Sequence, residues 1–187
     1  LVQFALMGDI FAQCVLGIKK PKIGLLNVGS EDIKGNSVVK QAYENLKRIE
    51  KQINFYGFVE GDDINKGIVD VVVTDGFSGN IALKTAEGVA DLIFTYLKNA
   101  YQSSFISKLG YILSKPALNR FKTRIDPRKY NGAVLLGLNG IIVKSHGGTD
   151  AFGFSNAISV AISLIKNNYV NTIENKLTGK HEWFFQK

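Results

Sequence analysis

Residues 69–80, VDVVVTDGFSGN, determine how the rest of this sequence is interpreted. Apolar or β-branched side chains at Val69 and positions 71–74, interrupted once by Asp70, predict a buried parallel strand. The run stops at the turn 75–80, and a helical pattern follows at once. In open α/β sheets such turns build anion and substrate sites, because a helix N-terminus offers free N–H groups and a partial positive charge. Tight turns also contain glycine for steric reasons, so a purely structural turn is the alternative.

Strands and helices alternate along the chain, which favours a three-layer α/β/α sandwich with a mostly parallel sheet. We expect strands at 22–28, 55–59, 69–74, 133–138 and 140–144, and helices at 1–17, 37–51, 81–100 and 151–168 with a final helix after them. Residues 103–125 predict two short helices broken at Pro116. No repeat or linker divides the chain, so we treat 1–187 as one unit in which 103–130 is an insertion.

The composition is that of an ordinary globular domain, with 187 residues, 45% of them hydrophobic and 21% charged. No apolar run reaches the roughly 18 residues that a membrane-spanning helix needs. Cys14, the single cysteine, excludes an internal disulfide and a Cys-based zinc cluster, and its apolar helical surroundings favour a buried thiol. The chain begins Leu-Val-Gln within a helical pattern and without a signal peptide, so we expect that an N-terminal part is missing.

Three polar, glycine-containing loops follow apolar strands: 29–36 (GSEDIKGN), 75–80 (DGFSGN) and 145–150 (SHGGTD). The carboxyl ends of parallel strands lie along one edge of a sheet, where ligands bind. We therefore expect the three loops to converge there. Their convergence would be stronger evidence for a site than any single loop.

Each polar side chain in these loops has a chemical and a structural interpretation. Lys34 could neutralise a phosphate or a developing oxyanion, or it could be a solvated loop lysine. Asn36 and Asn80 each precede a predicted helix, so their amides could hold an acyl oxygen or simply cap that helix. His146, beside two glycines at a strand end, could act in proton transfer or as a structural hydrogen-bonding group.

Two further groups remain open in the same way. Asp75 could cap its own turn or orient a cation, and Lys84 could face the site or solvent. The sequence lacks the motifs of several enzyme classes: GFSG is not the nucleophile elbow G-x-S-x-G, and there is no P-loop, H-E-x-x-H or G-x-G-x-x-G motif. What remains is a site for an anion suited to direct displacement on a bound electrophile. We expect it to need no cofactor and no metal ion.

With these loops identified, the chain resembles the bacterial phosphate acyltransferase family PlsX. The resemblance rests on LVQFALMG, IGLLNVGSEDIKGN, GFVEGDDI, VDVVVTDGFSGNIALKTAEG and NGAVLLGLNGIIVKSHGGTDA, which occur in family order from residue 1 to about 165. They correspond to roughly the C-terminal half of the family's length, or slightly more. The chain departs from the family pattern at Asp62, where Arg is common, and at Asn131 and Val134, where Gly and Pro are common.

The resemblance implies that inorganic phosphate attacks the thioester of an acyl group carried on acyl carrier protein, giving acyl-phosphate for phospholipid synthesis. It also implies an α/β/α fold like that of isocitrate and isopropylmalate dehydrogenases and phosphotransacetylases, usually as a homodimer. Carried over by motif, the catalytic positions are Lys34, Asn80 and His146. The substrate-binding positions are Asn36, Asp75, Gly76, Ser78, Gly79, Lys84 and Gly147.

The segment 103–130 carries most of the excess positive charge, with seven Lys or Arg against one Asp in a chain of net charge +7. Its apolar and basic residues interleave as in an interfacial amphipathic hairpin, which would meet an anionic membrane surface. Packing in a dimer interface and docking of the acidic carrier protein are the alternatives, whereas the long apolar face disfavours nucleic acid. The predicted contact residues are Phe105, Leu109, Ile112, Leu113, Lys108, Lys115, Arg120, Lys122 and Arg124.

Three rival functions stay open. A phosphotransacetylase-type enzyme acting on acyl-CoA would share the fold, and a non-catalytic lipid- or carrier-binding module would need no complete site. A metal-dependent dehydrogenase is disfavoured by the lack of carboxylates at metal-ligand spacing. The acyltransferase interpretation places the protein in the cytoplasm, peripherally associated with the inner face of the cell membrane.

Overall fold

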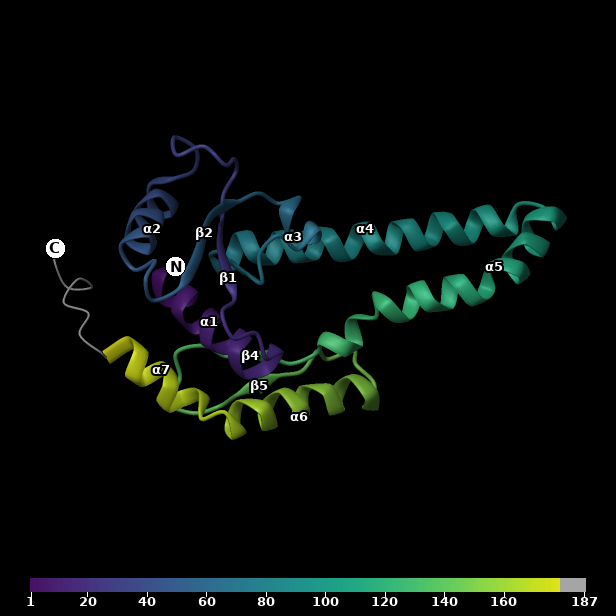
Figure 1. Ribbon diagram of the computed structural model, residues 1–187. Helices are drawn as coiled ribbons and strands as arrows, with labels where there is room; N and C mark the ends of the chain where they lie inside the picture. Colours follow the sequence, from purple (N-terminus) through teal and green to yellow (C-terminus); the bar gives the residue numbers. More distant parts are fainter. Residues whose placement is uncertain (179–187) are drawn as a thin grey trace.

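The computed structural model describes residues 1–178 of the chain (Figure 1). The helices are α1 (Val2–Leu16), α2 (Ser37–Arg48), α3 (Asp63–Lys66), α4 (Gly76–Gln102), α5 (Phe105–Arg124), α6 (Ala151–Lys166) and α7 (Tyr169–Thr178). The strands are β1 (Lys22–Leu26), β2 (Asn54–Val59), β3 (Val71–Val73), β4 (Ala133–Val134) and β5 (Val143–Lys144), and η1 (Pro127–Tyr130) is a 3-10 helix. This order confirms the predicted α/β class.

The main sheet has the strand order β2-β1-β3, with both pairs parallel. The ladder extends one residue past β1, where the Asn27 N–H donates to the Val59 carbonyl at 2.9 Å. The loops that leave β1 and β3 therefore start from the same edge of the sheet. The parallel sheet is as predicted, and with its helices it is consistent with a three-layer α/β/α fold.

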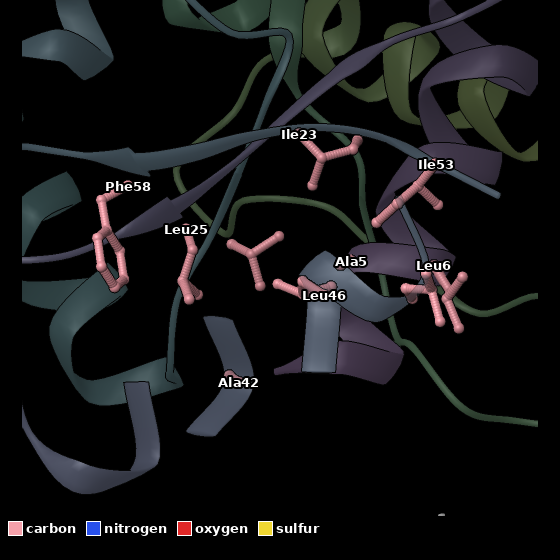
Figure 2. Close-up of a cluster of buried hydrophobic side chains, with 10 residues drawn as sticks. Ala5, Leu6, Ile23, Leu25, Ala42, Leu46, Ile53 and Phe58 are labelled. Atoms are coloured by element: carbon pink, nitrogen blue, oxygen red, sulfur yellow. The ribbon is translucent and has the colours of Figure 1, made fainter. Parts of the chain in front are cut away.

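The core lies where α1 and α2 pack against this sheet (Figure 2). The side chains of Leu6, Ile23, Leu25 and Leu46, from α1, β1 and α2, are completely buried. Burying side chains of this size stabilises by about 1.5–3 kcal/mol each. Strand β1 is thus held firmly up to the point where its polar loop begins.

A second cluster joins α1 to the C-terminal helices. Ile10 of α1 packs with Leu164 of α6 and Tyr169 at the start of α7. Beside it, Asp9 is 3% exposed, and its carboxylate pairs with the Lys176 ammonium of α7. A buried carboxylate is tolerable because it is paired in this way.

The predicted strands 133–138 and 140–144 do not join the parallel sheet. Instead β4 and β5 pair antiparallel in a two-stranded sheet of their own, which Leu135 N–H extends by donating to the Ile142 carbonyl at 2.9 Å. The glycines Gly137 and Gly140 lie in the turn between them, so the chain doubles back. The prediction that loop 145–150 leaves the same sheet edge as the other two loops is therefore wrong.

Helices α4 and α5 form a long arm, residues 76–124, that projects away from the sheet (Figure 1). Helix α4 begins at Gly76, not near Ile81, because the Asp75 side chain caps it. Helix α5 is continuous through Pro116, where two short helices were predicted. No side chain of either helix is buried. None of the described helices is both long and apolar enough to cross a membrane.

Candidate active site

Two of the three predicted loops start from one edge of the parallel sheet. Loop 27–36 follows β1, and Asp75 follows β3 after Thr74, on the strand that pairs directly with β1. The two segments thus combine a lysine, amide groups and a helix N-terminus. These are groups that can hold an anion or polarise a carbonyl.

Lys34 lies in loop 27–36 with its side chain exposed. Its N–H donates to the Glu31 carbonyl at 3.0 Å, and its own carbonyl accepts a hydrogen bond from the Asn27 amide at 3.3 Å. Its aliphatic stem passes close to Gly29, where an added Cβ would lie 2.9 Å from Lys34 Cγ. Across residues 1–178 no ion pair with the Lys34 ammonium is found, so this charge can receive an anion.

Asn36 is the N-cap of α2, because its Oδ1 accepts the Val39 N–H at 2.9 Å. The capping interpretation of Asn36 is therefore confirmed. The cap is neutral and the first turn of α2 contains no acidic residue, so the positive end of this helix is not neutralised. It lies two residues from Lys34, which places two positive features close together.

Asp75 is the N-cap of α4, and it changes the electrostatics expected for the DGFSGN segment. Its Oδ1 accepts the Ser78 N–H at 2.9 Å, and hydrogen bonds from Ser78 lower the pKa of this carboxyl. The Gly79 N–H is also used, in a bond to the Asp75 carbonyl at 3.0 Å. The carboxylate thus offsets the positive end of α4, and the backbone there is a poorer anion site than the sequence predicted.

Asn80 lies inside α4 and does not precede it, so of the two interpretations of its amide the structure rules out the helix cap. Its amide is therefore not used as a cap and projects from the second turn of the helix. Gly79 permits close packing of α4 on the strand end, because a Cβ there would lie 2.6 Å from Thr74 Cγ2. Gly76 has open space around its Cα. Lys84 pairs with Glu87 at 2.6 Å on the exposed side of α4, an arrangement that adds little stability.

His146 follows β5 and belongs to a separate network. Its N–H donates to Asn131 Oδ1 at 2.9 Å, while Asn131 Nδ2 donates to Ser145 Oγ and to the Gly153 carbonyl, both at 2.8 Å. The ring Nδ1 accepts the Gly148 N–H at 3.1 Å. That acceptor role places the proton of the neutral ring on Nε2, so in this geometry His146 can donate a hydrogen bond but cannot act as a base through Nδ1. Gly147, next to it, has open space around its Cα.

The contacts of three further residues were not predicted from the sequence. Asn27 and Asn131 each use their amide to hold a polar loop. Arg128 binds Asp126 at 2.6 Å and Asp150, the N-cap of α6, at 2.7 Å, which ties η1 to α6. From the sequence, Arg128 was recognised only as one of the basic residues of 103–130. An Asn at the end of an apolar strand is the signal that would have drawn attention to Asn27.

The predicted contact residues of 103–130 all lie on α5, and the apolar ones among them are exposed. Phe105, at the far end of the arm, is 82% exposed, and Leu113, near the middle of α5, is 77% exposed. The rings Phe94–Phe121 and Tyr101–Tyr111 connect α4 to α5, with centroids 6.1 and 5.4 Å apart. Lys108 and Lys122 line the groove between the two helices. The arm therefore presents apolar and basic groups to its surroundings.

No group of three or more His, Cys, Asp or Glu side chains within 1–178 is arranged to hold a metal ion. Cys14 is partly buried, which raises the pKa of its thiol, and its Sγ lies 3.9 Å from the Asn167 carbonyl. A thiol with a raised pKa is a poor nucleophile at neutral pH.

Comparison with known proteins gives consistent results. The model of a family described as "Fatty acid synthesis protein" matches residues 1–172. Curated proteins named "Phosphate acyltransferase" from Paramagnetospirillum magneticum and Rhodospirillum rubrum are 61% and 53% identical, over 92% and 95% of this chain. These alignments cover 49% and 51% of those proteins, so the chain spans about half the length of the curated relatives it matches.

Proposed function

Because the chain belongs to the fatty acid synthesis protein family, PlsX, we propose that it acts in the transfer of a fatty acyl group from acyl carrier protein to inorganic phosphate. The product is an acyl-phosphate, which supplies phospholipid synthesis. Relatives named phosphate acyltransferase support the acyl transfer to phosphate. That the acyl donor is acyl carrier protein is the more specific part of the proposal.

The observation that carries the proposal is the Lys34 loop at the sheet edge that it shares with the segment after β3. Phosphate is already a nucleophile, so no covalent enzyme intermediate is needed. The protein must hold phosphate close to the thioester carbon and stabilise the negative charge that develops on the carbonyl oxygen. The Lys34 ammonium, which has no ion-pair partner among residues 1–178, lies beside a helix with a neutral cap and suits the first task.

In the proposed reaction, an oxygen of hydrogen phosphate forms a bond to the thioester carbon and the carbon–sulfur bond breaks. The sulfur leaves as the carrier thiol, and the proton of hydrogen phosphate is transferred to it through solvent. We assign the phosphate or the oxyanion to Lys34 and the acyl oxygen to the Asn80 amide. His146 follows β5 in the separate sheet and not the Lys34 edge, so the role we propose for it is limited to donating a hydrogen bond from Nε2, since its Nδ1 accepts one from the Gly148 N–H.

The other predicted positions would have lesser roles in this proposal. Asn36 and Asp75 hold the starts of α2 and α4, while Gly76, Ser78, Gly79 and Gly147 shape the segments around the substrate. Lys84 is already paired with Glu87, so we expect it to matter least.

A competition between two thioesters tests which acyl donor the protein uses. We would supply acyl carrier protein thioester or acyl-CoA together with phosphate, and measure acyl-phosphate as its hydroxamate. The assay uses this chain and also a chimera in which the chain replaces the matching half of the Paramagnetospirillum magneticum relative. A strong preference for the carrier thioester supports the proposal, and a preference for acyl-CoA would favour the phosphotransacetylase alternative. A folded chimera that makes no acyl-phosphate would favour a binding module.

We also propose that the arm binds anionic membrane from the cytoplasmic side. Its exposed apolar residues would enter the interface, and its lysines and arginines would meet lipid phosphates at about 1 kcal/mol per charge. The L109E/L113E double variant should then lose co-sedimentation with anionic vesicles. The control is the I158E/I162E variant of α6, whose replaced side chains are 47% and 45% exposed, against 52% for Leu109 and 77% for Leu113.

A homodimer is the other expectation for the arm. Helix α4 exposes Leu92, Ile93 and Tyr96, which a second copy could cover. Sedimentation velocity distinguishes the two uses of the arm. If the arm serves only as a dimer contact through α4, L92E/I93E would halve the sedimenting mass, and L109E/L113E would leave vesicle binding unchanged.

A further inference from the structure

We propose that Asn27 is the positioning residue of the Lys34 loop, and that its buried amide fixes the loop conformation that presents the Lys34 ammonium at the sheet edge. This inference rests on the proposed function, in which Lys34 meets phosphate or the oxyanion. Asn27 lies directly after β1 and is 8% exposed, one of the few polar residues buried among those described. Buried amides are normally fully hydrogen-bonded, so its partners show what it does.

The backbone of Asn27 is part of the sheet. Its N–H donates at 2.9 Å to the carbonyl of Val59, the completely buried last residue of β2. The side chain therefore starts from a fixed point in the core, because β1 is held by β2 on one side and by β3 on the other. Contacts made by the Asn27 side chain therefore hold the loop in a fixed position relative to the sheet.

Both ends of the amide contact the loop. Oδ1 accepts the Val28 N–H at 2.9 Å, and Nδ2 donates to the Lys34 carbonyl at 3.3 Å. The second bond fixes the backbone from which the Lys34 side chain departs. A displacement of about 1 Å in a catalytic group can cost roughly 10²-fold in rate, so such a constraint has a kinetic consequence.

Gly35, the residue after Lys34, packs closely against the same Asn27 amide. Gly35 has φ +88, a conformation that L side chains rarely adopt, and a Cβ there would lie 2.2 Å from Asn27 Oδ1. The chain can pass this close only because Gly35 has no side chain. The loop is therefore matched to Asn27 both by hydrogen bonds and by shape.

The first test is a double-mutant cycle in whichever protein catalyses the reaction, the chain or the chimera. N27D keeps the acceptor for the Val28 N–H, but it has no N–H for the Lys34 carbonyl and places a second oxygen there. The matched control is N54A, at the opposite end of the sheet, where Asn54 Nδ2 donates to the Lys20 carbonyl, also at 3.3 Å.

We expect N27D to lower kcat about 10-fold or more with KM nearly unchanged, and to cause no further loss in the K34A background. N54A should retain the wild-type kcat. An equal loss from N27D in both backgrounds, or no loss at all, would overturn the positioning role. If K34A itself keeps the wild-type kcat, the proposed function of Lys34 fails and the inference fails with it.

A second readout does not depend on activity. Trypsin cleaves after lysine only where the backbone can leave its folded conformation. We expect cleavage of the Lys34–Gly35 bond, followed by mass spectrometry under native conditions, to be at least about 10-fold faster in N27D and unchanged in N54A. Equal cleavage rates in N27D and the wild type would show that the amide does not hold the loop.

Discussion

Replacing Gly35 with alanine perturbs the loop at its most constrained point. The backbone φ of +88 is unfavourable for alanine, and the new Cβ would lie 2.2 Å from Asn27 Oδ1. Because Asn27 is anchored in the sheet, the clash cannot be relieved by swinging a free side chain. Either the loop or the amide must move, and both hydrogen bonds of the amide are then at risk.

A substitution at a second glycine separates the backbone cost of a positive φ from the cost of the clash with Asn27. Gly67 has a similar φ of +65 but no atom within 4 Å of an added Cβ, so G67A pays the backbone cost alone. A non-glycine residue in the left-handed region costs about 1–2 kcal/mol. Loss of the two Asn27 hydrogen bonds adds about 1 kcal/mol each, so G35A should lower the free energy of unfolding by about 2 kcal/mol more than G67A.

Thermal unfolding measures this difference. For a chain of this size, 1 kcal/mol corresponds to about 2–4 °C in Tm, so Tm of G35A should lie about 4–8 °C below that of G67A. Circular dichroism at matched protein concentration is sufficient. If both variants lose the same Tm, the amide does not constrain Gly35, and the steric part of the reasoning is refuted.

Three further predictions follow from other contacts. K176M leaves the buried Asp9 carboxylate without its paired ammonium, so it should lower the free energy of unfolding, measured by urea denaturation, by about 3 kcal/mol. The double variant K176M/D9L should recover part of that loss, because it no longer buries a charge. Arg128 lowers the pKa of Asp126 from 3.8 to about 2, so the stability it provides should be complete above about pH 5 and be lost progressively as the pH falls toward and below 2. Urea midpoints of R128Q should show a weaker acid dependence over that range, and an unchanged dependence would contradict the assignment. L109E/L113E should abolish vesicle binding by the arm while I158E/I162E does not, and retained binding by the first variant would contradict a membrane role.

Local patterns predicted much of the fold, because their causes are local. The apolar periodicity of 37–51 and the alternating strands around it correspond to α2, β1 and β2 within a few residues. The start of α4 was missed because Gly-Phe-Ser-Gly-Asn has no apolar period, yet one hydrogen bond from Ser78 N–H to Asp75 begins the helix there. The carboxylate cap also altered the expected electrostatics of that segment.

The rest of the fold depends on contacts between residues far apart in the sequence, which local patterns do not predict. Two apolar runs separated by glycines suit either parallel or antiparallel strands, and only the turn between β4 and β5 decides that His146 leaves a separate sheet. The role of Asn27 depends on partners at Lys34 and at Val59, which no local pattern connects. Lys34 itself could be singled out from the sequence, because a lysine in a glycine-containing loop after a buried strand suits an anion.

The most direct test of the account is the rate of acyl-phosphate formation from acyl carrier protein thioester and phosphate, in wild type and K34A. Lys19→Ala removes the same charge from an exposed lysine at the opposite end of β1, and it serves as the control. We predict a loss of about 10²-fold or more in kcat for K34A, the size expected for a lost oxyanion or phosphate donor, and a wild-type rate for K19A. Equal rates in K34A and the wild type would contradict the account, because they would place the chemistry away from the Lys34 loop.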